Sequence, residues 1–419
     1  MLDNKLKEII SEFYAIPAAP FSVEEKTRYV KELIKRNGLE YEETPYFITT
    51  HLNNVPSKPK LFFISHLDHP GFIFKNKKEG IALGTLYLDK IEEYKPISVY
   101  SPEGTYLGDG SLEKISGRDN RSVEINTDFD IPKNSQGLWN VGNVRFEQEK
   151  IYGRSHDNDI ATALLLHSLK KSNNKDYEIV YVFTKHEEIL QQSSFNIASQ
   201  NSLGISEADL VVNLEAMKVY SITKEEKLSN LNYEDGPVLN ISEASRVYGR
   251  YGEQNIAESV INNIADELGV EIQRGLAGGT TDARVISEFG LTDNIVTINI
   301  PNRFKHNSDG KKVRAEEVYM RDLSSLSKII SKVTDSSELN TNINNKDITR
   351  ELGEKYFKKK KPFYILNKRL DIASKQIVKR GYYYPVTLLD YVKDIFYKGI
   401  SYIYYFVKKG LGSVEVSKE

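Results

Sequence analysis

Apolar residues along the chain follow two spacings, one typical of strands and the other of helices. Four short segments are almost continuously apolar: LFFIS at 61–65, EIVYVFT at 178–184, DLVVNLE at 209–215 and IVTINI at 295–300. Such segments are typical of strands that are buried on both faces. Between them, residues 159–171 and 253–269 repeat apolar side chains at helical spacing. Alternating strands and helices predict an α/β fold whose mostly parallel central sheet is flanked by helices.

The N-terminal region predicts two helices ahead of the first of these strands. Leu6, Ile9, Ile10 and Phe13 recur at helical spacing and indicate the first helix. A second is expected over 23–37, with Ser22 as its candidate N-cap.

Two other regions differ from this alternation. Residues 71–150 are rich in Gly, Pro and Asn and contain short β-type segments such as PISVYS, without a strong helical period. We interpret them as a small β-rich domain inserted into a discontinuous core made of 1–70 and 151–335. The polar, Asn-rich segment 334–347 is typical of a linker, so 336–419 is interpreted as a linker and a C-terminal appendage.

The C-terminal appendage is basic and rich in tyrosine. Residues 350–419 contain about 16 Lys and Arg against about 7 Asp and Glu. Residues 388–409 have an apolar and aromatic stripe at helical spacing, with lysines elsewhere. Such a helix could pack on its own protein or on a sister subunit, or it could lie on a membrane surface as a peripheral contact.

Composition narrows the function classes. The chain has 419 residues, a formal net charge of -2 and no cysteine. The near-neutral charge gives no overall signature of nucleic-acid binding. Without cysteine, a metal could be held only by His, Asp and Glu.

The N-terminus lacks the apolar core of a signal peptide, and no segment of about 18 uncharged apolar residues is present. We therefore expect a cytoplasmic protein.

Candidate chemistry gathers at the ends of the predicted strands. His66 and Asp68 follow the first strand, Glu187 and Glu188 the second, and Glu215 ends the third. His306 follows the fourth strand, and Asp157 precedes a predicted helix. Sites in open α/β sheets form beyond the carboxyl ends of the strands, so these side chains are expected to converge.

Two imidazoles and three carboxylates would suit a pair of divalent ions. Glu187, beside the candidate ligand Glu188, could serve as the free carboxylate that takes a proton from water. Asp68 could accept a hydrogen bond from His66 and fix its tautomer.

Six segments within residues 5–335 form an ordered set: SHLDHPGF (65–72), GRSHDNDIATALL (153–165), VFTKHEEI (182–189), LVVNLEAM (210–217), AGGTTDARVI (277–286) and IPNRFKHNSDG (300–310). This set resembles the M42 family of metallo-aminopeptidases, which belongs to the wider group that includes the M28 and M20 zinc peptidases. The resemblance implies a zinc-peptidase-like core and two divalent ions, zinc first, with cobalt or manganese as alternatives.

The resemblance also implies a role for each candidate residue. His66 resembles a ligand of one metal, His306 a ligand of the other, and Asp157 the carboxylate that bridges them. The terminal carboxylate ligands would be Glu188 and Glu215, and Glu187 is similar to the general base. Asp68 resembles the partner of His66, and a cis peptide is implied between Asp157 and Asn158. The insert at 71–150 is implied to take part in subunit assembly, which predicts a homo-oligomer.

Several positions depart from the family's usual pattern, among them a second His in SHLDHPGF and the lack of the Gly that commonly follows the Glu187–Glu188 pair. The family usually has Asp where this chain has Glu215, and often Arg where Asp159 stands. One extra methylene changes the reach of the Glu215 carboxylate.

Simpler interpretations stand beside these roles. His66 and Asp68 could form a structural pair, Asp157 could cap a helix, and Glu187, Glu188, Glu215 and His306 could be surface residues. His69, His156 and His186 are interpreted as bystanders. Backbone N–H groups of Gly278, Gly279 and Thr280 could hold substrate, or GGTTD at 278–282 could only form a turn and helix cap. Trp139 is interpreted as a packing residue or part of the surface of the insert, rather than as a platform for substrate.

The predicted function is hydrolysis of N-terminal residues from peptides. Two alternatives remain at this stage: a metal-dependent amidohydrolase or deacylase acting on a non-peptide amide, and a non-catalytic binding or scaffold protein that retains the fold. Expected partners are peptide substrates and further copies of the same chain, with no nucleic acid.

Overall fold

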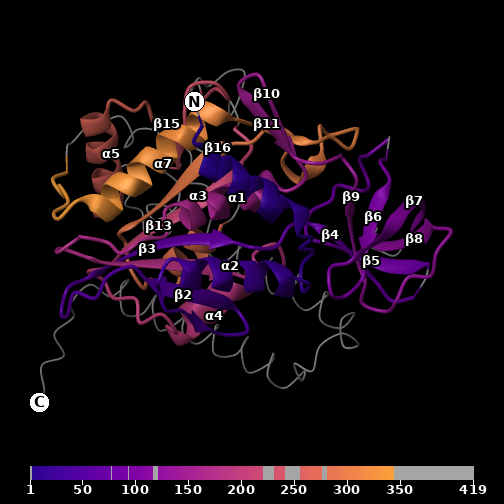
Figure 1. The fold of residues 1–419 in the computed structure, drawn as a ribbon, viewed down its shortest axis with the longest axis horizontal. Coiled ribbons are helices and arrows are strands. Elements are labelled where there is room, and N and C mark those ends of the chain that lie inside the picture. The colour runs from indigo at the N-terminus through magenta and orange to yellow at the C-terminus, as the bar shows by residue number, and fades with distance from the viewer. Residues whose placement is uncertain are drawn as a thin grey trace, which may run out of the picture.

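The computed structural model describes residues 2–343, apart from 77, 93, 117–120, 220–230, 241–254 and 276–280. A large sheet with helices on both faces forms the body of the molecule, and a small barrel projects from one end of it (Figure 1). A separate three-stranded sheet joins β10 (Arg145–Glu147), β11 (Lys150–Gly153) and β17 (Glu316–Tyr319).

The large sheet has eight strands in the order β1-β2-β12-β3-β13-β16-β14-β15. Their bounds are β1 (Glu42–Glu43), β2 (Phe47–His51), β3 (Lys60–His66), β12 (Glu178–Thr184), β13 (Leu210–Met217), β14 (Val238–Asn240), β15 (Gln273–Gly275) and β16 (Ile295–Pro301). The four near-continuous apolar segments of the sequence are β3, β12, β13 and β16, at the centre of the sheet. Their burial on both faces explains their composition.

The sheet is mixed, which refines the prediction of a mostly parallel one. Strands β12, β3, β13 and β16 run parallel to their neighbours in this group, and β14 is parallel to β15. The pairs β1/β2, β2/β12 and β14/β16 are antiparallel. Residues 44–46 alone connect β1 to β2, and a connection this short permits only an antiparallel pair.

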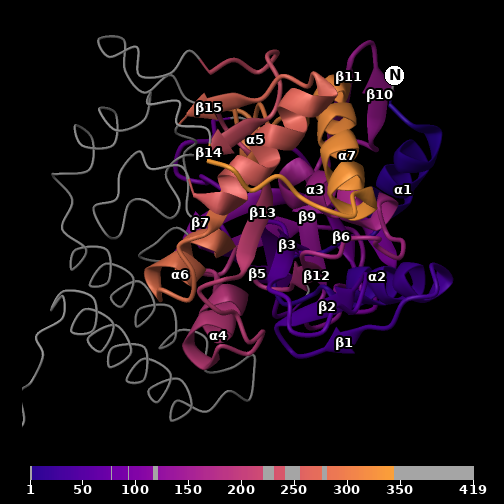
Figure 2. The same ribbon diagram turned by 90° about the vertical axis from the view of Figure 1, so that its left-hand side faces the viewer.

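Helices cover both faces of the large sheet (Figure 2). Five contribute to the main core on one face: α1 (Asn4–Ala15), α2 (Glu24–Arg36), α3 (His156–His167), α5 (Ile256–Leu268) and α7 (Met320–Asp335). On the other face, α4 (Gln192–Gln200) and α6 (Asp282–Glu288) pack through residues such as Ile197 and Ile286. The predicted first helix is confirmed, and its apolar residues are buried.

The second helix begins differently from the prediction. Val23, not Ser22, occupies the N-cap of α2, and it makes no side-chain hydrogen bond to the helix. Glu24 and Glu25 lie in the first turn instead, where negative charge interacts favourably with the exposed N–H groups.

A closed barrel contains the strands between residues 71 and 139. Its members, in spatial order, are β4 (Gly71–Phe74), β5 (Glu79–Leu83), β8 (Ser122–Asn126), β7 (Tyr106–Ser116), β6 (Ile97–Tyr100) and β9 (Gln136–Trp139). Trp139 is buried at its centre, with its ring 5.1 Å from that of Phe72 and 6.0 Å from that of Tyr94. Its interpretation as a packing residue is confirmed.

The candidate appendage lies almost entirely outside the described residues, which end at residue 343. The amphipathic helix predicted over 388–409 therefore stays a prediction. Among the helices that the structure describes, none is both long enough and apolar enough to cross a membrane.

Candidate metal centre

The central parallel strands deliver most of the candidate residues to one edge of the sheet. His66 is the last residue of β3, Glu215 lies near the end of β13, and Glu187 and Glu188 follow β12. His306 lies in a short 3-10 helix, η2 (Lys305–Asn307), just beyond β16. Because these strands are neighbours and run parallel, their carboxyl ends meet at the same edge.

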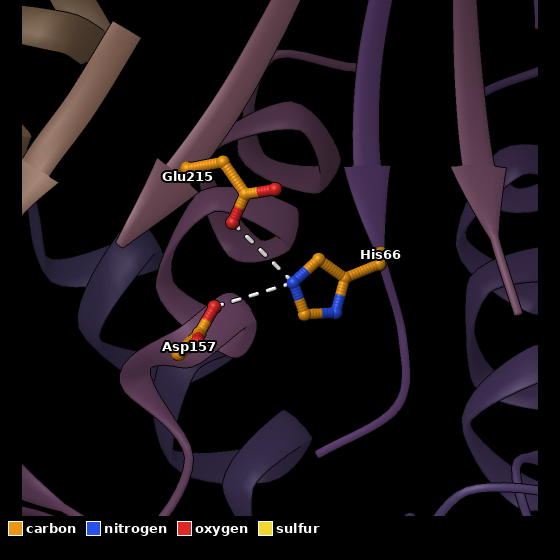
Figure 3. A group of neighbouring side chains, drawn as sticks. All are labelled: His66, Asp157 and Glu215. Carbon is orange, nitrogen blue, oxygen red and sulfur yellow. Dashed lines mark hydrogen bonds and ion pairs between the residues drawn. The ribbon is translucent and has the colours of Figure 1, made fainter. Parts of the chain in front are cut away.

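One group consists of His66, Asp157 and Glu215, all of which are buried (Figure 3). The Nε2 atom of His66 lies 3.2 Å from Asp157 Oδ1 and 3.4 Å from Glu215 Oε2. Although Glu215 is one methylene longer than Asp, its carboxylate still lies beside the imidazole of His66.

The second group consists of Asp157, Glu188 and His306. The Nε2 atom of His306 lies 3.0 Å from Asp157 Oδ2 and 3.1 Å from Glu188 Oε1. Asp157 thus directs one carboxylate oxygen at each imidazole and belongs to both groups. The peptide bond between Asp157 and Asn158 is cis, as the resemblance to the family implies.

The donor atoms fit divalent ions. Ligands about 2.0–2.2 Å from a tetrahedral ion lie roughly 3.3–3.6 Å from one another, close to the observed separations in both groups. Each Nε2 faces two carboxylate oxygens, although a single N–H can point well at only one of them. Glu188 Oε1 is buried and has no hydrogen-bond partner among the described residues. A cation within each group would satisfy all of these atoms.

His66 is held in the tautomer that a metal ligand needs. Its Nδ1 atom lies 3.0 Å from the backbone carbonyl oxygen of Asp68 and 3.6 Å from the carboxylate. Because a carbonyl only accepts, Nδ1 carries a proton, and Nε2 is the nitrogen that faces the acidic groups. The carbonyl oxygen of Asp68 is thus the nearer acceptor, and the predicted role of the Asp68 carboxylate as partner of this imidazole stays a prediction.

The Asp68 carboxylate instead organises the loop after β12. It accepts hydrogen bonds from the backbone N–H groups of Glu187 (2.9 Å, to Oδ1) and Glu188 (3.1 Å, to Oδ2). Glu187 Oε1 accepts from Gln191 Nε2 at 3.2 Å, while Glu187 Oε2 lies 4.0 Å from His66 Nε2. The two adjacent glutamates therefore point into the same site from a loop whose backbone Asp68 fixes.

The charges of the centre shift its pKa values in opposite directions. Burial would lower the pKa of His66, but the Glu215 and Asp157 carboxylates outweigh it and raise that pKa well above its usual value. In the same way Glu188 and Asp157 raise the pKa of His306 to about 9 against the effect of burial. Burial raises the pKa of Glu187 well above its usual range, and the neighbouring carboxylates add to the shift. Carboxylates are thus in excess, and the centre attracts cations.

Glu316 is a residue of the centre that sequence analysis missed. Its buried carboxylate accepts from the backbone N–H of Asp157 at 3.0 Å and from that of His306 at 2.6 Å. Asn302 Nδ2 donates to the same carboxylate at 3.1 Å. Burial and the nearby Asp157 raise the pKa of Glu316 to about 8. The only sequence signal was a pair of glutamates that opens β17, ten residues after His306.

Lys305 is the second missed residue. Its Nζ atom lies 2.7 Å from Asp157 Oδ2, the oxygen that also faces His306. The neighbouring carboxylates outweigh burial and raise the pKa of this lysine, so it carries a positive charge inside the centre.

The barrel also contributes a side chain to the centre. Tyr87, in the loop that follows β5, stacks on the ring of His306, with centroids 6.2 Å apart and an interplanar angle of 29°. About 38% of Tyr87 is exposed, so this residue borders solvent beside the candidate metal ligands.

The three other histidines near the motifs contact other groups, as the bystander interpretation requires. His69 bonds the backbone carbonyl of Asp157 and the side chain of Asn307, and burial lowers its pKa to about 3. His156 bonds the carbonyl of Ile151 at 2.9 Å, and the ring of His186 lies 5.1 Å from that of Phe21.

Asp159, which stands where the family often has Arg, forms an ion pair with a lysine. Asp159 and Lys26 form a fully buried ion pair, so the negative charge at 159 is balanced by α2. Gly278, Gly279 and Thr280 lie outside the described residues, and their substrate-binding role stays a prediction. The adjacent Thr281 caps α6, accepting from the backbone N–H of Arg284 at 3.4 Å.

An α/β sheet with two linked His–carboxylate groups at the carboxyl ends of its parallel strands defines the class of metal-dependent hydrolases. Residues 128–328 match the family model described as M42 glutamyl aminopeptidase. This part of the chain is therefore an M42 glutamyl aminopeptidase domain. No curated protein sequence matches it.

Solved structures of archaeal peptidases share the fold. The TET1 peptidase of Pyrococcus horikoshii is 18% identical, with a TM-score of 0.62, and the match covers 79% of this chain and 99% of that one. An aminopeptidase from Desulfurococcus kamchatkensis is also 18% identical, with a TM-score of 0.62 over 79% and 94% of the two chains. A TET aminopeptidase from a marine sediment thaumarchaeon is 14% identical, with a TM-score of 0.62 over 83% and 99%.

Proposed function

We propose that this protein removes N-terminal residues from peptides and that two divalent ions assist the reaction, with zinc as the leading candidate metal. The observation that carries the proposal is the position of Asp157, whose two oxygens face two different imidazoles. Oδ1 lies 3.2 Å from His66 Nε2, and Oδ2 lies 3.0 Å from His306 Nε2. The proposed ligands are His66, Asp157, Glu188, Glu215 and His306.

When bound, such a pair of ions polarises the substrate carbonyl and lowers the pKa of water. Glu187 is the proposed general base, which takes a proton from the attacking water and passes it to the leaving amine. Its place in the site supports this role: Gln191 binds one carboxylate oxygen, and the other lies 4.0 Å from His66 Nε2. Asp68 is a positioning residue, because its carboxylate holds the backbone N–H groups of both glutamates.

Substrate is proposed to lie against residues from two further segments. Backbone N–H groups of Gly278, Gly279 and Thr280 would hold the peptide near the ligands, as the sequence suggests. Tyr87 is the proposed aromatic wall, since it touches His306 and is partly exposed.

The protein is also proposed to form a homo-oligomer. The P. horikoshii TET1 peptidase can assemble into a tetrahedron or a large octahedral shell, and another of the similar structures is a dodecamer. In the proposed division, the barrel region at 71–150 takes part in assembly, 1–70 with 151–335 form the catalytic domain, and 336–419 form an appendage. Light scattering on the purified chain measures the assembly directly.

A substrate panel tests the proposed reaction. The metal-free protein is assayed with zinc, cobalt or manganese against aminoacyl chromophores, the same compounds with an acetylated amine, and simple acyl amides. An aminopeptidase cleaves the free-amine compounds only. Preferential cleavage of the acetylated compounds or acyl amides would favour a deacylase, and no cleavage at any metal concentration would favour a binding or scaffold protein.

A further inference from the structure

Lys305 brings a positive charge into direct contact with the shared carboxylate of the centre. Its Nζ atom lies 2.7 Å from Asp157 Oδ2, and His306 Nε2 lies 3.0 Å from the same oxygen. The lysine and the histidine are adjacent in η2, so one short turn directs both side chains at Asp157.

The contact is asymmetric with respect to the two groups of ligands. Asp157 Oδ2 belongs to the group with Glu188 and His306, whereas the group with His66 and Glu215 uses Oδ1. The lysine contact that the structure shows is therefore with the oxygen that the group of Glu188 and His306 uses.

A divalent ion and this ammonium compete for the same oxygen. An ion about 2.0–2.2 Å from Asp157 Oδ2 would lie within about 5 Å of Nζ in its present position. Like charges at this distance in a buried site repel strongly. The carboxylates of Glu188, Glu215 and Glu187 also attract the lysine, so part of the negative charge available to a second ion is already balanced.

We propose that Lys305 is a built-in competitor for the second ion and makes the two metal positions unequal. The position of His66, Asp157 and Glu215 binds its ion tightly, and the position of Asp157, Glu188 and His306 binds its ion weakly and reversibly. This inference rests on the proposed two-ion site.

The lysine side chain is suited to such an exchange. About 21% of the side chain is exposed, so it lies at the border between the centre and solvent. Its four-carbon stem rotates freely, and its charge is a compact point that solvates well. Metal availability would then set the fraction of chains with both positions filled.

Calorimetric titration of the metal-free full chain with Zn²⁺ tests the inference, with bound metal counted by elemental analysis. The variants are Lys305→Met, Lys305→Gln in case the first fails to fold, and Lys305→Arg, which keeps the charge. Lys31→Met is the matched control, because it also removes a lysine from an ion pair (2.8 Å, with Glu43), far from the centre along the chain.

In the wild type we expect two unequal Kd values. Lys305→Met or Lys305→Gln should lower the weaker Kd about 10–100-fold and change the tighter one little. Lys305→Arg and Lys31→Met should keep the wild-type inequality. Two equal and tight sites in the wild type, or a weaker Kd that does not change when the charge is removed, would overturn the inference and leave the two-ion function standing. If no variant and no wild-type chain bound Zn²⁺, the proposed function itself would fall, and this inference with it.

Discussion

The buried carboxylate of Glu316 accepts a hydrogen bond from the backbone N–H of Asp157, with an N···O distance of 3.0 Å. Its other oxygen accepts from the backbone N–H of His306 at 2.6 Å. These residues are 149 positions apart in the sequence, yet one side chain fixes the main chain of both. Asp68 acts in the same way on Glu187 and Glu188, so two buried carboxylates fix the main chain of three proposed ligands, Asp157, Glu188 and His306.

Glu316→Gln should weaken metal binding about 10–100-fold, as is typical when the support of a metal ligand is lost. An amide has one accepting oxygen, so its NH₂ group would face one of the two backbone N–H groups. Titration of the metal-free protein measures the change. Glu317→Gln is the control: Glu317 pairs with Lys150 (2.9 Å) and Arg303 (3.4 Å), and its loss should leave metal affinity unchanged. Wild-type affinity in Glu316→Gln would exclude the supporting role.

Glu187→Gln should separate proton transfer from metal binding. The amide has nearly the same volume but cannot accept a proton, so kcat should fall by about 10²–10⁴-fold with metal affinity almost unchanged. Glu188→Gln should instead weaken metal binding, and excess metal should restore part of the activity. Paired measurements of hydrolysis rate and metal titration distinguish the two variants. Near wild-type turnover in Glu187→Gln would remove this residue from the mechanism.

Tyr87→Ala should raise KM for peptides without a matching loss of metal affinity. This partly exposed residue lies beside His306, where it can contact substrate, while no acidic ligand is removed. We expect a KM several-fold higher, corresponding to roughly 1 kcal/mol of lost contact. Tyr106→Ala is the matched control, since Tyr106 is another exposed tyrosine of the barrel, 55% exposed, and contacts Tyr100. Equal kinetics for both variants would contradict the proposed wall.

Asp322 should make the protein less stable as the pH rises toward neutrality. Burial raises its pKa to about 7, and neither carboxylate oxygen has a hydrogen-bond partner among the described residues. Between about pH 4 and pH 7 the folded state holds a proton that the unfolded chain has lost, so the stability contribution of this group falls as the pH increases through that window. Above pH 7 the loss is complete.

Asp322→Asn cannot ionise, so it should gain roughly 2–4 kcal/mol in the free energy of unfolding over the wild type between pH 4 and pH 7. Denaturant unfolding at a series of pH values measures this difference. Asp335→Asn, which changes an exposed carboxylate at the other end of α7, should show no such trend. A stability difference that is independent of pH would mean that Asp322 is already ionised in the fold.

The sequence predicted those features that follow from repeating patterns and from order along the chain. The segments at 178–184 and 295–300 match β12 and β16 almost residue for residue, because strands buried on both faces have few tolerated polar positions. The clustering of the candidate ligands followed in turn, since parallel neighbours bring their ends together. A mixed sheet could not be foreseen, because strand direction at the edges depends on short turns and tertiary pairing.

Lys305 and Glu316 escaped prediction for a different reason. Their positions depend on the backbone around η2, where Phe304, His306 and Asn307 all have positive φ angles of 58–68°. L-residues adopt this conformation only when surrounding contacts impose it, and no local pattern in the sequence encodes those contacts. The direction of a side chain from such a turn therefore becomes visible only in the folded structure.

The spread of the proposed ligands along the chain has a consequence for synthesis. Ribosomes make the chain from the N-terminus, so His66 emerges long before His306, and β3 waits for β12 and β13 to arrive on either side. A nascent chain that stops before β16 lacks η2, and with it both His306 and Lys305. The centre therefore matures late, after about three quarters of the chain has been made. Until then, no folded structure brings the acidic side chains of the centre together.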